Sequence, residues 1–93
     1  MTMAGIIETR LAELGIELPE APAPVANYMP YVKTGNLAVL SGQVTIWNGE
    51  LKYIGKIGED LSVEQGAEAA RMCALNLIAQ VRAAWDGALD RVR

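Results

Sequence analysis

Histidine is absent from the 93-residue sequence, and Cys73 is its one cysteine. Without histidine the chain lacks the usual general base at neutral pH, the commonest zinc ligand and the usual acid–base pair of ribonucleases. One cysteine cannot form an internal disulfide or a metal site with several cysteine ligands. We therefore expect no metal site and no cofactor.

Positive charge is also scarce. Eight lysine and arginine residues stand against 11 aspartate and glutamate residues, which gives a net charge of −3. No basic stripe is present that would attract a phosphate backbone, so nucleic acid is not an expected partner. The N-terminal residues include neither a basic region nor a long apolar run, so no signal peptide and no membrane span are predicted. We expect a cytoplasmic protein with no membrane partner.

Apolar residues, by contrast, are plentiful. They make up 52% of the chain, although a domain this short buries only about 60% of the surface that its unfolded chain exposes. Small proteins with more apolar residues than their own core needs often place the excess at subunit interfaces. The composition thus predicts one domain over residues 1–93 that assembles into a homo-oligomer.

Residues 1–24 are predicted to form a short helix followed by an extended strap. Apolar side chains repeat over residues 6–14 at the spacing of one helix face, and Gly15 suits the C-terminal cap of that helix. Three prolines lie within residues 19–24. Because proline lacks the N–H that a sheet ladder needs, we expect this stretch to cross the surface as a strap.

The next segment predicts antiparallel strands joined by tight turns. Residues 27–33 suit a first strand at a sheet edge, since this strand contains a proline. Residues 37–47 are almost continuously apolar, as expected of a strand covered on both faces. Asn48 and Gly49 are typical of a type I′ hairpin turn, and residues 50–54 are expected to return as the partner strand.

One long helix completes the prediction for residues 25–93. Ser62 and Gln65 have the spacing of a capping box, in which each side chain bonds the backbone N–H of the other. A stripe of apolar residues follows at alternating spacings of four and three, and we expect it to pack against the sheet. The stripe comprises Val63, Ala67, Ala70, Ala74, Leu77 and Val81, and it is widened by Cys73 and Ile78. After the helix, Val92 suits the start of a further strand.

Ser41, Gly42 and Gln43 interrupt the apolar strand predicted over residues 37–47. Two interpretations fit this pattern. Glycine inside a strand can mark a bulge, with the two polar side chains bonding nearby backbone. Alternatively, the three residues form the floor of a ligand groove, where glycine lets a ligand approach the backbone. Nucleophilic catalysis by Ser41 is disfavoured because the sequence supplies no base for it.

Other chemically interesting residues have ordinary explanations. Cys73 lies in the helical stripe and is expected in the core, because cysteine is among the most buried residue types. Trp47 and Trp85 are expected in the core or at a subunit interface. Tyr28 and Tyr31 suit either packing or the lining of a ligand site, and the sequence pattern alone does not choose between these roles.

Taken in order, six short motifs resemble the RidA/YjgF family, also called L-PSP endoribonucleases. The similarity covers essentially the whole chain and is greatest to the subgroup with an N-terminal helix and a proline-rich strap. The motifs are Ala26-Asn27-Tyr28, Thr34-Gly35-Asn36-Leu37, Leu40-Ser41-Gly42-Gln43, Gly55-Lys56-Ile57-Gly58, Leu61-Ser62-Val63-Glu64-Gln65-Gly66 and Ala74-Leu75-Asn76.

This resemblance implies an α+β fold of the chorismate-mutase type, in which a mixed sheet is backed by helices and three subunits form a trimer. It also implies ligand clefts between subunits and the hydrolysis of reactive enamines and imines to keto acids and ammonia. Tyr28, Ser41, Gly42 and Gln43 match the family's cleft positions and are the expected substrate-binding residues. The expected substrate is a small molecule with a carboxylate.

The resemblance also implies that part of the family's domain lies beyond this sequence. The family's substrate-binding arginine and a downstream acidic residue belong to later strands, and neither Arg91 nor Arg93 matches that arginine motif. The sheet of this chain is therefore expected to be incomplete, with open edges. Three functions follow for comparison: an enamine/imine deaminase, a non-catalytic binding or assembly module of the same fold, and, with less support, an endoribonuclease.

Overall fold

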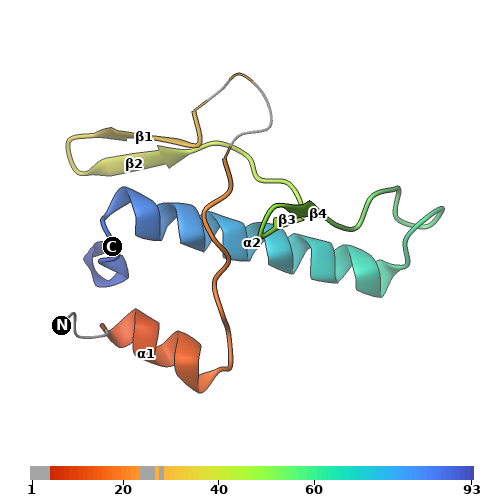
Figure 1. Ribbon diagram of the computed structural model, residues 1–93, viewed down its shortest axis with the longest axis horizontal. Helices are drawn as coiled ribbons and strands as arrows, with labels where there is room; N and C mark the ends of the chain where they lie inside the picture. Colours follow the sequence, from red (N-terminus) through yellow and green to blue (C-terminus); the bar gives the residue numbers. More distant parts are fainter. Residues whose placement is uncertain (1–4, 24–26, 28) are drawn as a thin grey trace.

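The computed structural model describes residues 5–23, 27 and 29–93, and it confirms the α+β class. A long helix, α2, runs through the middle of the molecule, and the other elements are arranged around it (Figure 1). In chain order the elements are α1 (Ile6–Glu13), β1 (Tyr31–Thr34), β2 (Leu37–Leu40), β3 (Ile46–Trp47), β4 (Glu50–Leu51), α2 (Val63–Ala84) and the 3₁₀ helix η1 (Leu89–Arg91). None of the helices in the described part of the chain is both long and apolar enough to cross a membrane.

Within the described residues the strands form two separate antiparallel pairs. In the first pair β1 lies beside β2, with Tyr31 opposite Leu40. In the second pair β3 lies beside β4 across a turn at Asn48 and Gly49. These two residues have φ angles of 49° and 86°, which confirms the predicted type I′ geometry, because that turn needs positive φ at both central positions.

The prediction of one continuous strand over residues 37–47 is wrong in the middle, because residues 41–45 are not in a strand. The Ser41 N–H still donates to Pro30 O at 3.0 Å, but the ladder stops there. Beyond it, the Gln43 amide nitrogen bonds the Ser41 carbonyl at 3.1 Å. Such local bonds compete with a sheet ladder for the same backbone groups. The expected cover on both faces is also absent, since the Val39 side chain is 61% exposed.

Helix α2 begins as the sequence predicts, and hydrogen bonds satisfy backbone groups at both of its ends. The Gln65 N–H donates to Ser62 Oγ at 3.1 Å, and the Ser62 N–H donates to Gln65 Oε1 at 2.8 Å, so the capping box is confirmed. At the other end Asp86 and Gly87 adopt positive φ angles, and the Gly87 N–H bonds the Arg82 carbonyl at 2.7 Å. This bond satisfies one of the carbonyls left unpaired at a helix end.

The face that α2 buries is not the predicted one. Leu75, Ala79 and Ala84 are buried, whereas Val63 and Leu77 in the predicted stripe are 73% and 39% exposed. Apolar residues occur on both sides of this helix, so their periodicity marks two faces suited to packing. It does not indicate which of the two faces the strands cover.

Two buried amides attach neighbouring segments to α2. The Asn76 side-chain nitrogen donates to the carbonyls of Val44 and Ile46 at 3.1 and 2.8 Å. The Gln80 side-chain nitrogen donates to the Pro22 carbonyl at 2.8 Å. The first amide therefore fixes the segment that follows Ser41–Gln43, and the second fixes the strap, part of which lies outside the described residues.

The N-terminus of helix α1 is capped by a residue near the C-terminal end of the sequence. The Asp90 carboxylate accepts the N–H groups of Ile6 and Ile7 at 2.7 and 2.9 Å. It thereby replaces the side-chain cap that the N-cap residue, Gly5, cannot supply. A Cβ on Gly5 would clash with the Asp90 carboxylate, so glycine at this position leaves room for the carboxylate to cap α1.

Candidate functional site

The predicted cleft residues lie where β2 ends. Ser41 and Gln43 are half-buried and Gly42 is exposed. The Ser41 hydroxyl donates to the Met29 carbonyl, while Gln43 bonds the Ser41 carbonyl as described above. Both polar side chains thus contact nearby backbone, as the bulge interpretation expects. Tyr28, the fourth predicted residue, lies outside the described residues.

Gly42 supports the other interpretation. Its φ is not among the positive values, and a Cβ built on it would meet no atom within 4 Å. Neither the backbone conformation nor the packing of the described chain therefore requires glycine here. A close approach by a ligand or a partner chain would require it. The geometry is compatible with a binding surface at this position.

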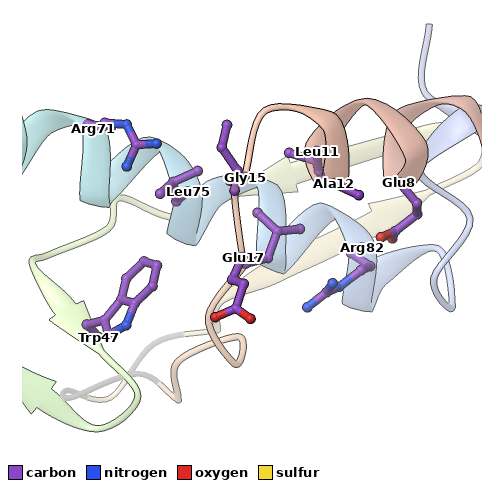
Figure 2. A pocket seen from close by; sticks show the side chains of 11 residues that line it. Glu8, Leu11, Ala12, Gly15, Glu17, Trp47, Arg71, Leu75 and Arg82 are labelled. Carbon is purple, nitrogen blue, oxygen red and sulfur yellow. The ribbon is translucent and has the colours of Figure 1, made fainter.

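A groove beside α2 was not predicted from the sequence. A hollow of about 690 Å³ lies between α1, the start of the strap and α2 (Figure 2). Arg71 and Arg82 contribute to it from α2, and Trp47 contributes from β3. The other lining residues are Glu8, Leu11, Ala12, Gly15, Ile16, Glu17, Leu18 and Leu75.

The formal charges of this groove balance, because Glu8 and Glu17 line it together with the two arginines. The arginines are eleven residues apart, which is almost exactly three helical turns, so they lie on one face about 16 Å apart along α2. Neither forms an ion pair within the described residues. The spacing of Arg71, Leu75 and Arg82 on one helix face was the available signal in the sequence, but it resembles that of an ordinary solvated face.

A second hollow of about 610 Å³ continues the groove past Arg71. Trp47, Arg71 and Leu75 line both hollows, and Tyr53 lines the second one. The Tyr53 hydroxyl donates to the Glu68 carboxylate at 2.7 Å. This hydrogen bond, followed by desolvation and the Glu68 charge, raises the pKa of Tyr53 above its ordinary value.

The part of the groove around Arg71 can hold a small anion. Arg71 supplies a planar guanidinium that matches a carboxylate, and the Trp47 indole and Leu75 supply apolar surface beside it. Lys52 adds a second cation in the same hollow, although its ammonium lies 3.3 Å from Glu50. The described side chains of this arrangement include no evident general base, so the role that they support is ligand binding.

Comparison with known proteins gives concordant matches. A family model described as "YjgF/chorismate mutase-like, putative endoribonuclease" matches residues 8–93. Protein TCP17 of Trypanosoma cruzi is 41% identical over 90 residues, which are 97% of this chain and 56% of that protein.

Two solved structures resemble the fold. A "putative endoribonuclease" from Shewanella oneidensis MR-1 aligns with a TM-score of 0.76 and 43% identity, over 83% of this chain and 51% of the other. The protein Atu1372 of Agrobacterium tumefaciens, of unknown function, aligns with a TM-score of 0.73 and 44% identity, over 87% and 48% of the two chains. The chain thus spans about half the length of these relatives.

Proposed function

Because this chain belongs to the YjgF/chorismate-mutase-like family, we propose that it functions in the hydrolysis of reactive 2-enamine and 2-imine acids to keto acids and ammonia. The observation that supports this proposal most directly is the break in the sheet after β2. There the Leu40–Gln43 motif, which resembles the cleft motif of enamine and imine deaminases, leaves the ladder and offers polar groups beside an exposed Gly42.

The reaction needs one water molecule. An enamine first becomes its imine tautomer. The oxygen of water then bonds to the imine carbon and loses one proton, while the C=N electrons move to nitrogen, which takes up a proton, so that a carbinolamine forms. The amino nitrogen takes up a second proton, the C–N bond breaks with its electron pair leaving on ammonia, and the C=O bond forms as the hydroxyl loses its proton to solvent. Imine and water thus yield keto acid and ammonia with no oxidant or cofactor.

Ser41, Gly42 and Gln43 orient the substrate in this proposal. The Ser41 hydroxyl proton is used on the Met29 carbonyl, so Ser41 Oγ offers a ligand its lone pairs. Gln43 uses one N–H on the Ser41 carbonyl and keeps its second N–H and its carbonyl oxygen for the ligand. Gly42 allows the ligand to approach the backbone, and Tyr28 is proposed to complete the cleft.

The test generates the substrate in place. An amino-acid dehydratase that releases 2-aminoacrylate is mixed with the chain, and pyruvate formation is followed with and without it. We expect the wild-type chain to accelerate pyruvate release, and Ser41→Ala and Gln43→Ala each to reduce that acceleration about threefold to tenfold, as expected for loss of one ligand hydrogen bond. Thr9→Ala, a polar-to-alanine change on α1, is the matched control and should leave it unchanged. Equal acceleration by all four proteins would remove these residues from the site.

A non-catalytic role as a small-molecule-binding module is the second candidate, and the groove beside α2 favours it. A keto acid can place its carboxylate on Arg71 and its alkyl part against Trp47. Calorimetry with pyruvate distinguishes the two sites. Binding that is lost in Arg71→Gln but kept in Ser41→Ala and in Arg10→Gln, a matched control on α1, supports the groove. Binding that depends on Ser41 supports the cleft.

The endoribonuclease activity named for the Shewanella relative has less support here. The chain has no histidine and carries a net charge of −3, whereas RNA binding draws on positive charge. Retention of a labelled single-stranded RNA that weakens steeply between 50 and 200 mM salt would support this activity. Equal mobility of the RNA with and without the chain at 50 mM salt would exclude it.

A further inference from the structure

We propose that the second hollow beside α2 binds a free α-amino acid with an apolar side chain. The carboxylate of this ligand lies on Arg71 and its ammonium group lies on Glu68, both of which line the hollow. Ser41, Gly42 and Gln43 do not line it. The inference rests on the second candidate function, the binding module, whose ligand it narrows from a carboxylate to an α-amino acid. It is independent of the hydrolysis proposed at the cleft.

Arg71 and Glu68 present opposite charges side by side on α2. They are three residues apart, so their Cβ atoms lie about 5–6 Å from each other on one face of the helix. Both residues are exposed, and neither forms an ion pair within the described residues. The ammonium of Lys52, which lines the same hollow, is already paired with Glu50 at 3.3 Å. The hollow therefore keeps one cation and one anion for a ligand.

Tyr53 holds Glu68 in place, because its hydroxyl donates to the Glu68 carboxylate at 2.7 Å. The carboxylate has about four lone-pair sites, so it can accept an ammonium group as well. Tyr53 has a φ of 52°, a left-handed conformation that is rare for a large side chain and is retained most often at functional sites. The preceding backbone is fixed by Thr45, whose carbonyl accepts the Lys52 N–H at 2.8 Å and whose hydroxyl donates to the Lys52 carbonyl. Tyr53 thus orients Glu68 from a fixed position.

The rest of the hollow suits the carbon atoms of such a ligand. Trp47 and Arg71 lie at the same end of the groove (Figure 2), and Met72 and Leu75 line the hollow from α2. The flexible methionine side chain adapts to apolar groups of different shape. The faces of Trp47 and Tyr53 also attract an ammonium group by cation–π interaction. The volume of about 610 Å³ lies within the range typical of small-molecule sites, about 300–1,000 Å³.

The ligand needs both of its charges for this complementarity. An α-amino acid carries its carboxylate and its ammonium group on one carbon, so its opposite charges are neighbours, as those of Arg71 and Glu68 are. A keto acid of the same shape leaves Glu68 without a partner, and the matching amine leaves Arg71 without one. Because both residues are exposed to water, each ion pair contributes less than a buried pair would. We expect the loss of either charge to weaken binding at least fivefold.

The experiment compares three ligands that share the leucine side chain: L-leucine, 4-methyl-2-oxopentanoate and 3-methylbutylamine. Calorimetry on the wild-type chain should show that leucine binds at least fivefold more tightly than either of the others. Glu68→Gln removes the charge but keeps an oxygen for the Tyr53 hydroxyl, so it should weaken leucine binding at least fivefold without weakening that of the keto acid. Glu64→Gln, one turn away on α2 and outside the lining residues, is the matched control and should leave leucine binding unchanged.

Arg71→Gln tests the other charge. It should weaken the binding of both leucine and the keto acid at least fivefold, whereas Arg10→Gln on α1 should preserve both. Equal affinities for leucine and the keto acid, or leucine binding that Glu68→Gln leaves unchanged, would overturn the amino-acid assignment while the binding-module candidate stands. No binding of any of the three ligands would overturn both. Circular dichroism verifies that the variants fold, and the comparison of ligands on the wild type depends on no variant.

Discussion

Asn76 is predicted to hold the candidate cleft segment in place, and its removal should cost a large part of the stability of the chain. The side chain is fully buried and donates two hydrogen bonds, to the carbonyls of Val44 and Ile46. Each such bond contributes about 1 kcal/mol, and truncation of a buried side chain adds a cavity cost of about 1 kcal/mol. We therefore expect Asn76→Ala to lower the free energy of unfolding by about 2–3 kcal/mol.

Gln80→Ala provides the internal comparison. This side chain is 2% exposed but makes one such bond, to the Pro22 carbonyl, so the expected loss is about 1–2 kcal/mol. In a chain of this size about 1 kcal/mol shifts Tm by about 4–8 °C. Thermal unfolding followed by circular dichroism should therefore show a drop of roughly 10 °C or more for Asn76→Ala and a smaller one for Gln80→Ala.

Asn76→Asp separates hydrogen bonding from volume. The carboxylate has the shape of the amide but cannot donate to either carbonyl, so this variant should be at least as unstable as Asn76→Ala at pH 7. Because burial beside two carbonyls favours the protonated carboxyl, the variant should lose stability as pH rises from about 4. A Tm for Asn76→Ala within 3 °C of wild type, or a larger loss in Gln80→Ala, would refute the assigned role of Asn76.

Three further outcomes follow from the structure. Asp90→Ala should lower the free energy of unfolding by about 1–2 kcal/mol, measured by urea titration, because α1 loses the carboxylate at its N-terminus; no loss would contradict that contact. Ser62→Ala should lower the free energy of unfolding by about 1 kcal/mol in the same assay, because α2 loses its N-terminal cap. An unchanged urea midpoint would argue against a stabilising role of this cap. Absorbance titration should show that Tyr53 ionises above pH 10 in the wild type and nearer pH 10 in Glu68→Ala. The contribution of the Tyr53–Glu68 hydrogen bond to stability is therefore present below pH 10 and is lost as pH rises through the raised pKa of Tyr53. Identical titrations would exclude the contact.

Short sequence motifs correctly predicted the elements that depend on interactions between neighbouring residues. The capping box at Ser62, the turn at Asn48 and Gly49, and the class of the fold are all confirmed, because each depends on neighbouring residues or on composition. The motif resemblance to the family is confirmed by the comparisons. The assignment of Tyr28, Ser41, Gly42 and Gln43 to a substrate cleft stays a prediction.

Other features depend on contacts distant in sequence and were missed for that reason. The hydrogen bond that the Ile6 N–H donates to the Asp90 carboxylate joins residues 84 positions apart. No pattern in either segment of the sequence predicts this bond. The buried face of α2 was wrongly assigned because two of its faces are apolar and burial depends on which strands are present. The groove at Arg71 combines α1, β3 and α2, so it exists only after those elements have packed together.

The most direct test of the proposed function compares this chain with its Shewanella relative in one assay. Both proteins are added at equal concentration to a dehydratase that releases 2-aminoacrylate, and pyruvate formation is recorded by stopped flow. The chain is measured alone and joined to the part of the relative that lies outside the match. We expect acceleration by the relative, by the chain alone and by the joined form, with Ser41→Ala reducing it in the joined form. Acceleration by the relative together with none from the folded joined form would contradict the account.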